Sequence, residues 1–256
     1  MPTEAEEVWR YSGIDAFDLA GFAPAPAARP APSGPAVAVA RRLADSLGRR
    51  AGLVVTLNGV IEVIEITGPA PESLSVTGAR ASAPGAPGPE HLGSLAPGRD
   101  AFGELHDAFV ADVVLVGVAR KAVVVDPVVV VHVVDPGAAT APGLAVFPHT
   151  LVELGTSAEA GIIELVAPGV VGAELPAGEG PDPTPLASLV VPVTELHVAD
   201  DARLRYANLQ VLGQGSTSLA VQASRVGRDA TLQSFTAGLG GRYARVRTDS
   251  DLVGQA

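Results

Sequence analysis

Apolar residues in the second half of the chain are gathered in short, β-branched runs. From about Asp112 onward these runs recur at close spacing, among them VVLVGVA, AVVVDPVVVVHVV, AGIIELVA, ASLVVPVTELHV and ARLRYANLQVL. No helical periodicity interrupts them, and turn-forming residues separate them. Many short strands joined by tight turns are typical of a sandwich, a barrel or a β-helix. The pattern thus predicts a mainly β fold for residues 112–256 without deciding among the three.

Three of these runs are similar to one another. Each opens with Ala, any residue, and then Ile or Leu: Ala160-Gly161-Ile162, Ala202-Arg203-Leu204 and Ala230-Thr231-Leu232. The second and third segments have the spacing of one coil of a solenoid. A Pro/Gly-rich insertion, Ala167–Pro185, accounts for the longer spacing between the first two. Stacked coils are therefore favoured, and a sandwich with chance similarity between strands stays the alternative.

The N-terminal part of the chain has a different character and is expected to form a separate helical and mixed module. The pattern predicts helices over Thr3–Leu19, Ala36–Arg50 and Phe102–Phe109, and Thr3 and Glu6 have the spacing of a capping box. Two apolar runs around Asn58-Gly59 predict a β-hairpin over Leu53–Ile66. Pro-, Ala- and Gly-rich stretches, Phe22–Pro35 and Ser82–Gly98, are expected to be linkers. We therefore divide the chain into a module of residues 1–111 and a β core of residues 112–256.

Composition and charge exclude several kinds of binding site and partner. The chain has no cysteine, so it contains neither disulfides nor thiolate ligands for a metal or cluster. Its formal net charge of -11 argues against nucleic acid or an anionic membrane as partner. The acidic N-terminus lacks the features of a secretory signal, and no apolar stretch is long enough to span a membrane. We therefore expect a cytoplasmic protein.

Motifs for catalysis are scarce. Neither a phosphate-binding loop nor a G-x-S-x-G nucleophile elbow is present. The best candidates for metal ligands are three histidines of the β region, His132, His149 and His197. They could converge on a metal with Glu153, Glu164 or Glu195. No pair has a short metal-binding spacing, so ordinary surface or partly buried histidines are favoured. We therefore assign no catalytic, cofactor-binding or metal residue, and a metal- or carbohydrate-acting β-fold enzyme is the alternative.

Several segments resemble the SufB/SufD family of the SUF iron–sulfur cluster assembly machinery. The N-terminal Glu7-Val8-Trp9-Arg10-Tyr11 is similar to a family E-x-W-R-Y segment, and Pro127–His132 and Phe147–Leu151 are similar to family strands. The best matches follow in the family's order near the end of the chain, at Leu204–Gln210, Arg228–Leu232 and Gly240–Arg247. The chain looks like SufD and not SufB, because SufB-type chains carry a cysteine used in cluster assembly.

The resemblance implies a right-handed parallel β-helix that follows an N-terminal helical module. It also implies a non-catalytic scaffold subunit that pairs with a SufB-like paralogue and a SufC-like ABC ATPase. No cofactor is expected on this chain alone; an iron–sulfur cluster, with a flavin as a further candidate, belongs to the assembled complex. The sequence stops at Leu252-Val253-Gly254-Gln255-Ala256, where the family pattern would continue through further coils and a C-terminal helical domain. We therefore expect a truncated member, and carry no functional residue of the family onto it.

Overall fold

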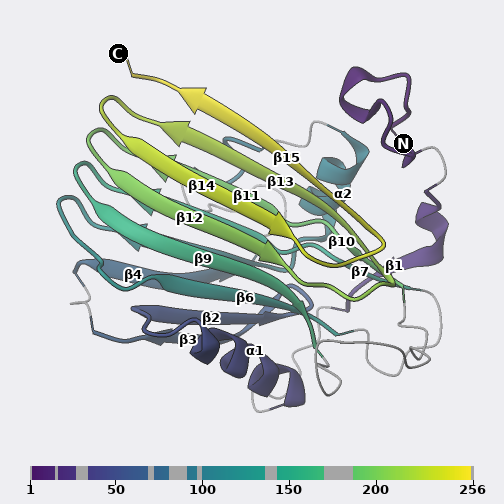
Figure 1. Ribbon diagram of the computed structural model, residues 1–256, viewed down its shortest axis with the longest axis horizontal. Coiled ribbons are helices and arrows are strands. Elements are labelled where there is room, and N and C mark those ends of the chain that lie inside the picture. The colour runs from purple at the N-terminus through teal and green to yellow at the C-terminus, as the bar shows by residue number, and fades with distance from the viewer. Residues whose placement is uncertain are drawn as a thin grey trace.

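The strands that the structure describes form two sheets, seen one behind the other in the computed structural model (Figure 1). Sheet A has the order β1 (Phe22–Pro24), β7 (Gly143–Val146), β10 (Ser188–Val190), β13 (Ser216–Val226), β11 (Val193–Val198), β8 (His149–Leu154), β5 (Asp112–Val118) and β4 (Leu74–Arg80), and β15 (Tyr243–Leu252) pairs with β13. Sheet B has the order β14 (Thr231–Gly238), β12 (Arg203–Gln210), β9 (Glu159–Pro168), β6 (Val128–Val134), β2 (Gly52–Leu57) and β3 (Val60–Ile66). The structure describes residues 2–14, 17–26, 34–68, 72–80, 91–96, 100–135, 143–169 and 187–254.

From β5 onward the chain alternates between the two sheets. Strands β6, β9, β12 and β14 belong to sheet B; before, between and after them the chain forms the sheet A strands β5, β7 with β8, β10 with β11, β13 and β15. Within each sheet these strands pair in parallel with the preceding and the following coil. The prediction of a mainly β fold is thus confirmed, with mixed sheets in which parallel pairing dominates.

The local predictions for the N-terminal module have mixed outcomes. Helices α1 (Pro35–Ser46) and α2 (Ala101–Phe109) lie where two of the three helices are predicted. The hairpin of β2 and β3 is also confirmed: Asn58 and Gly59 both have positive φ, at 51° and 86°, as its tight turn requires. Strands β2 and β4 join sheets B and A, so this segment shares its sheets with the β core.

The predicted helix over Thr3–Leu19 is wrong. Among the described residues from 3 to 21 the structure has no α-helix, only short 3₁₀ turns such as η1 (Glu7–Trp9) and η3 (Leu19–Gly21). Positive φ angles at Tyr11 (62°) and Gly13 (69°) are incompatible with a continuing right-handed helix. Half of the predicted capping box does form, because the Thr3 backbone N–H donates to Glu6 Oε1 at 3.1 Å.

Two strands lie where none is predicted. Strand β1 occupies the start of the Pro-rich stretch, and its proline is tolerated because β1 is at the edge of sheet A. Strand β4 pairs antiparallel with β5 and buries Leu74 and Val76, whose alternation with Ser75 and Thr77 was the available signal. Most of the two predicted linkers and of the Ala167–Pro185 insertion falls outside the described residues.

The register corrects one of the predicted repeat alignments. Leu204 lies opposite Leu232, as predicted, but its partner on β9 is Ala160 and not Ile162. The error is two residues, and because side chains alternate with period two, such a slip leaves every residue on its expected face. The pattern of apolar positions therefore could not detect it.

Apolar side chains from both sheets fill the space between them. Val54, Val114, Val130, Val152, Ile162 and Leu196 belong to one buried cluster there. On the outer face of sheet B, α1 packs Val37 and Ala40 against Val129 and Val131 of β6. On the other side of the molecule, Trp9 packs on Phe102 of α2, with ring centroids 5.6 Å apart. Each sheet thus has a shared inner face and an outer face that a helix partly covers.

Candidate functional site

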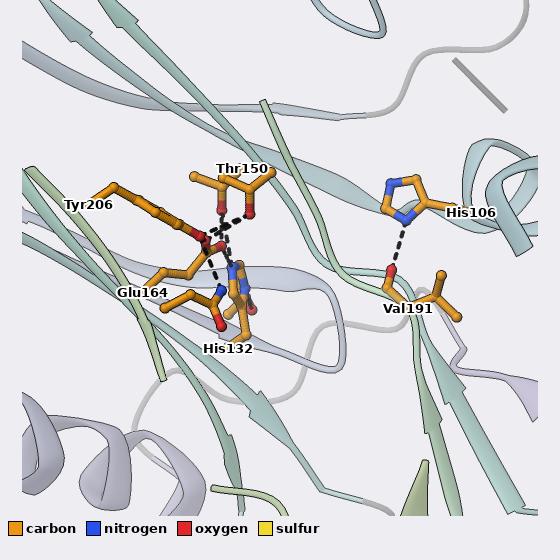
Figure 2. A network of polar contacts seen from close by, with 9 residues as sticks. His106, His132, Thr150, Glu164, Val191 and Tyr206 are labelled. Atoms are coloured by element: carbon orange, nitrogen blue, oxygen red, sulfur yellow. Dashed lines mark hydrogen bonds and ion pairs between the residues drawn. The ribbon is translucent and has the colours of Figure 1, made fainter. Parts of the chain in front are cut away.

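Polar side chains interrupt the apolar interior at one level of the stack. Glu164 of β9 is the centre of this inner network (Figure 2), whose other members are Thr56, His132, Thr150, Thr194 and Tyr206. His132 Nε2 lies 2.8 Å from Glu164 Oε1, and Thr150 Oγ1 donates to the same oxygen at 2.6 Å. Thr194 Oγ1 donates to Glu164 Oε2 at 2.8 Å, and Tyr206 donates to that oxygen as well. All these groups are buried.

The donors keep Glu164 ionised in an otherwise apolar interior. Burial alone would raise the pKa of its carboxyl, but the hydrogen bond and the charge of His132, with the bonds from Thr150 and Tyr206, lower the pKa to about 2. Conversely, burial and the charge of Glu164 raise the pKa of Tyr206 well above its usual value. Both carboxylate oxygens are saturated by protein donors, so this network is suited to holding the two sheets together and has no open position for a ligand.

A second set of polar contacts joins α2 to the outer face of sheet A. His106 of α2 donates from Nδ1 to the Val191 carbonyl at 2.9 Å, and its Nε2 lies 3.0 Å from Nδ1 of His149. His149 Nε2 lies 3.0 Å from Glu195 Oε1. Burial, followed by the charge of His149, lowers the pKa of His106 to about 3. A neutral His106 with its proton on Nδ1 must accept at Nε2, so His149 donates to it.

The Glu195 carboxylate, at the end of this series of contacts, also binds a loop. The backbone N–H groups of Gly93 and Leu95 donate to the two oxygens of Glu195, at 2.6 and 2.8 Å. Burial raises the pKa of Glu195, but the hydrogen bonds from His149 and from these two backbone groups outweigh it, and the pKa is lowered. The Glu195 carboxylate therefore ties residues 91–96 to sheet A.

Beside this loop, a groove of about 690 Å³ opens on the outer face of sheet A. Three side chains meet at one part of its wall: His91 from the loop, Glu153 of β8 and His197 of β11. His91 Nδ1 lies 2.6 Å from Glu153 Oε1, and the rings of His91 and His197 are 4.6 Å apart between centroids. Burial, followed by the charge of His91, lowers the pKa of His197.

The structure separates the three histidines that the sequence groups together. His132 is in the inner network, His149 is under α2, and His197 is in the groove. Each lies beside one of the three predicted glutamates: His132 and His149 contact Glu164 and Glu195, and His197 is in register with Glu153. In the described part of the chain, no group of three or more His, Asp or Glu side chains could hold a metal ion.

Sequence reasoning missed three participants: Tyr206, His106 and His91. The sequence did contain a signal for Tyr206, because it is the single aromatic residue of its strand; in the structure it lies opposite Ile162 of β9. The two histidines come from the segment before the β core, and no local pattern connects them with strands that follow much later in the chain.

The comparison with protein families adds an assignment to this geometry. Residues 137–256, a little under half of the chain, match the family model for the SufBD core domain, described as part of the SUF system for FeS cluster assembly. The match supports membership of the SufB/SufD family. It covers β7 to β15, most of the strands that alternate between the two sheets. No curated protein matches the chain. No helix among the described residues has the length and apolar character needed to cross a bilayer.

Proposed function

We propose that this chain is a non-catalytic scaffold subunit of the SUF system for iron–sulfur cluster assembly. The observation that carries the proposal is the match of residues 137–256 to the SufBD core domain. The alternation of parallel strands between two sheets supports the finer expectation of a right-handed parallel β-helix. On this proposal the protein is cytoplasmic and SufD-like, and residues 1–111 form the module that precedes the β core.

The proposed partners are a SufB-like paralogue and a SufC-like ABC ATPase. Because the chain has no cysteine, any thiolate that binds a cluster must come from a partner.

Co-expression tests the proposal directly. A tagged form of this chain is produced with the SufB-like and SufC-like proteins of the same organism, and the purified material is examined for stoichiometric co-purification. We expect both partners to be retained, and reconstitution with iron and sulfide to give a cluster only in the presence of the SufB-like chain. Retention of neither partner, or a cluster on this chain alone, would contradict the proposal.

The structure gives less support to an enzyme built on His132, His149 and His197. The first two are buried and saturated by protein partners, and neither lines the groove that His197 lines. The scaffold is therefore the function that we propose.

A further inference from the structure

We propose that the outer face of sheet B docks an amphipathic, acidic helix of a partner protein. A groove of about 440 Å³ lies on this face, over β9 and β12. Its lining is mainly apolar and includes one arginine, with Val125, Pro127, Gly161, Arg205, Ala207 and Phe235 among its residues. The groove is distinct from the one on sheet A, with which it shares no lining residue.

The groove is about as wide as one helix. Gly161 of β9 and Ala207 of β12 form its floor. Val125 and Pro127 border it beside β6, and Phe235 of β14 borders its other side. Neighbouring strands are about 4.8 Å apart and a helix with its side chains is about 10–12 Å across, so one helix covers two strands. Helix α1 covers β2 and β6 in this way, and β9 and β12 are the next two strands of the sheet (Figure 1).

Apolar surface continues from α1 into this groove. Ile163 of β9 packs against the cluster beneath α1 and also lines the groove. At the borders of the groove, Val125 is 82% exposed and Phe235 is 61% exposed. A helix that lies beside α1 would remove both side chains from water, and burial of apolar surface is the dominant favourable term in most protein association.

Gly161 keeps the floor of the groove low, although the fold does not require glycine at this position. Its φ is not positive, and an added Cβ would lie 3.6 Å from Pro127 Cβ, which is an ordinary van der Waals contact. A glycine within a strand often marks a place where another backbone approaches closely. The floor is therefore suited to a helix that packs close to the sheet.

The occupant must satisfy its own backbone hydrogen bonds. Strand β9 pairs with β6 and β12, and β12 pairs with β9 and β14, so the backbone groups of both floor strands are already used. An extended segment on this face would keep unpaired N–H and C=O groups, whereas a helix pairs these groups internally. This difference favours a helix over an added strand.

One charge in the groove has no counterpart on the described part of the chain. Arg205 is exposed and makes no ion pair with a described residue, whereas Arg203, two positions before it on β12, pairs with Glu159 at 2.9 Å. The register partners of Arg205 are Gly161 and Gln233, and neither of them is charged. A carboxylate on the flank of the docked helix would complement this arginine.

The occupant is a helix of another protein, because the two α-helices that the structure describes are already packed. Helix α1 buries Val37 and Ala40 on sheet B. Helix α2 buries Phe102 against Trp9. A second copy of this chain would have to undock one of these helices before the helix could enter the groove.

Two labelled peptides, each stapled into a helix, test the groove by fluorescence anisotropy with the full-length protein. Both carry a stripe of Ala and Leu; one has Glu beside the stripe, and the other has Lys at the same positions. We expect the Glu helix to bind more tightly than the Lys helix. G161L, which fills the floor, and F235S, which removes apolar surface, should each weaken binding of the Glu helix at least about 10-fold. R205E should invert the preference between the two helices.

The matched controls are L239S and R242E, which change an exposed leucine and an exposed arginine outside the groove and should leave both affinities unchanged. Circular dichroism and urea unfolding confirm that each variant is folded. Binding of neither helix, equal affinity for the two, or undiminished binding of the Glu helix by G161L would overturn the proposal. Self-association that G161L abolishes would also overturn it, because the occupant would then be a second copy. The test needs no SUF partner, so its outcome is independent of the proposed SUF role.

Discussion

Replacing Glu164 by glutamine tests whether the inner network stabilises the fold as an ionised centre. Glutamine has nearly the same shape but cannot ionise, and its NH₂ group would face hydroxyl donors where a carboxylate oxygen now accepts. Loss of hydrogen bonds to a buried charged group costs about 1.5–3 kcal/mol each. We therefore expect E164Q to be less stable than the wild type by at least about 2 kcal/mol at neutral pH.

The same carboxylate makes the difference depend on pH. The pKa of Glu164 is about 2 in the folded protein and 4.5 as an ordinary glutamate, so the unfolded chain takes up the proton first as the pH falls. Its contribution is complete above pH 4.5 and is lost as the pH falls towards 2. At about 1.4 kcal/mol per pKa unit it amounts to about 3 kcal/mol. About 2 kcal/mol of this should disappear between pH 5 and pH 3.

Urea unfolding followed by the fluorescence of Trp9, the single tryptophan, measures this effect. Trp9 is buried against Phe102, so its emission should report unfolding. The difference in unfolding free energy between the wild type and E164Q should shrink by about 2 kcal/mol from pH 5 to pH 3. E104Q, an exposed control, should follow the wild type at each pH. A difference that stays constant over this range would refute an ionised Glu164.

Two further predictions concern backbone packing and protonation. G240A should destabilise the protein by about 1–3 kcal/mol or more in urea unfolding, because an added Cβ would lie 2.0 Å from the Leu212 carbonyl oxygen. The control is G213A, whose added Cβ would have no atom within 4 Å. It should change the unfolding free energy by less than about 0.5 kcal/mol. Equal effects of the two would contradict the tight approach at Gly240. His106, whose pKa is about 3, should remain neutral with its proton on Nδ1 at pH 5 in ¹H–¹⁵N NMR spectra of the ring; a doubly protonated ring would contradict this.

Local features of the fold could be read from the sequence because their causes are local. The Asn58-Gly59 turn needs two residues that tolerate positive φ, and the flanking apolar runs supply the hairpin. The helix over Thr3–Leu19 failed because apolar spacing does not reveal a positive φ at a residue such as Tyr11.

The stacking of coils was harder to predict than these local features. On successive strands of sheet A, the paired positions run from His149 to Val193, then to Val221 and then to Arg247. The intervals between these positions shorten along the chain, because the loops that join the strands differ in length from coil to coil. No fixed period therefore marks the coils in the sequence.

The candidate site was predicted in its residue types but not in its grouping. The six side chains singled out by sequence, three histidines and three glutamates, do form histidine–glutamate neighbours. What separates them is the alternation of faces: Thr150 points inward to the Glu164 network, while His149, one residue before it, points outward to α2. Which face each histidine takes depends on register, and register depends on loops whose lengths vary from coil to coil.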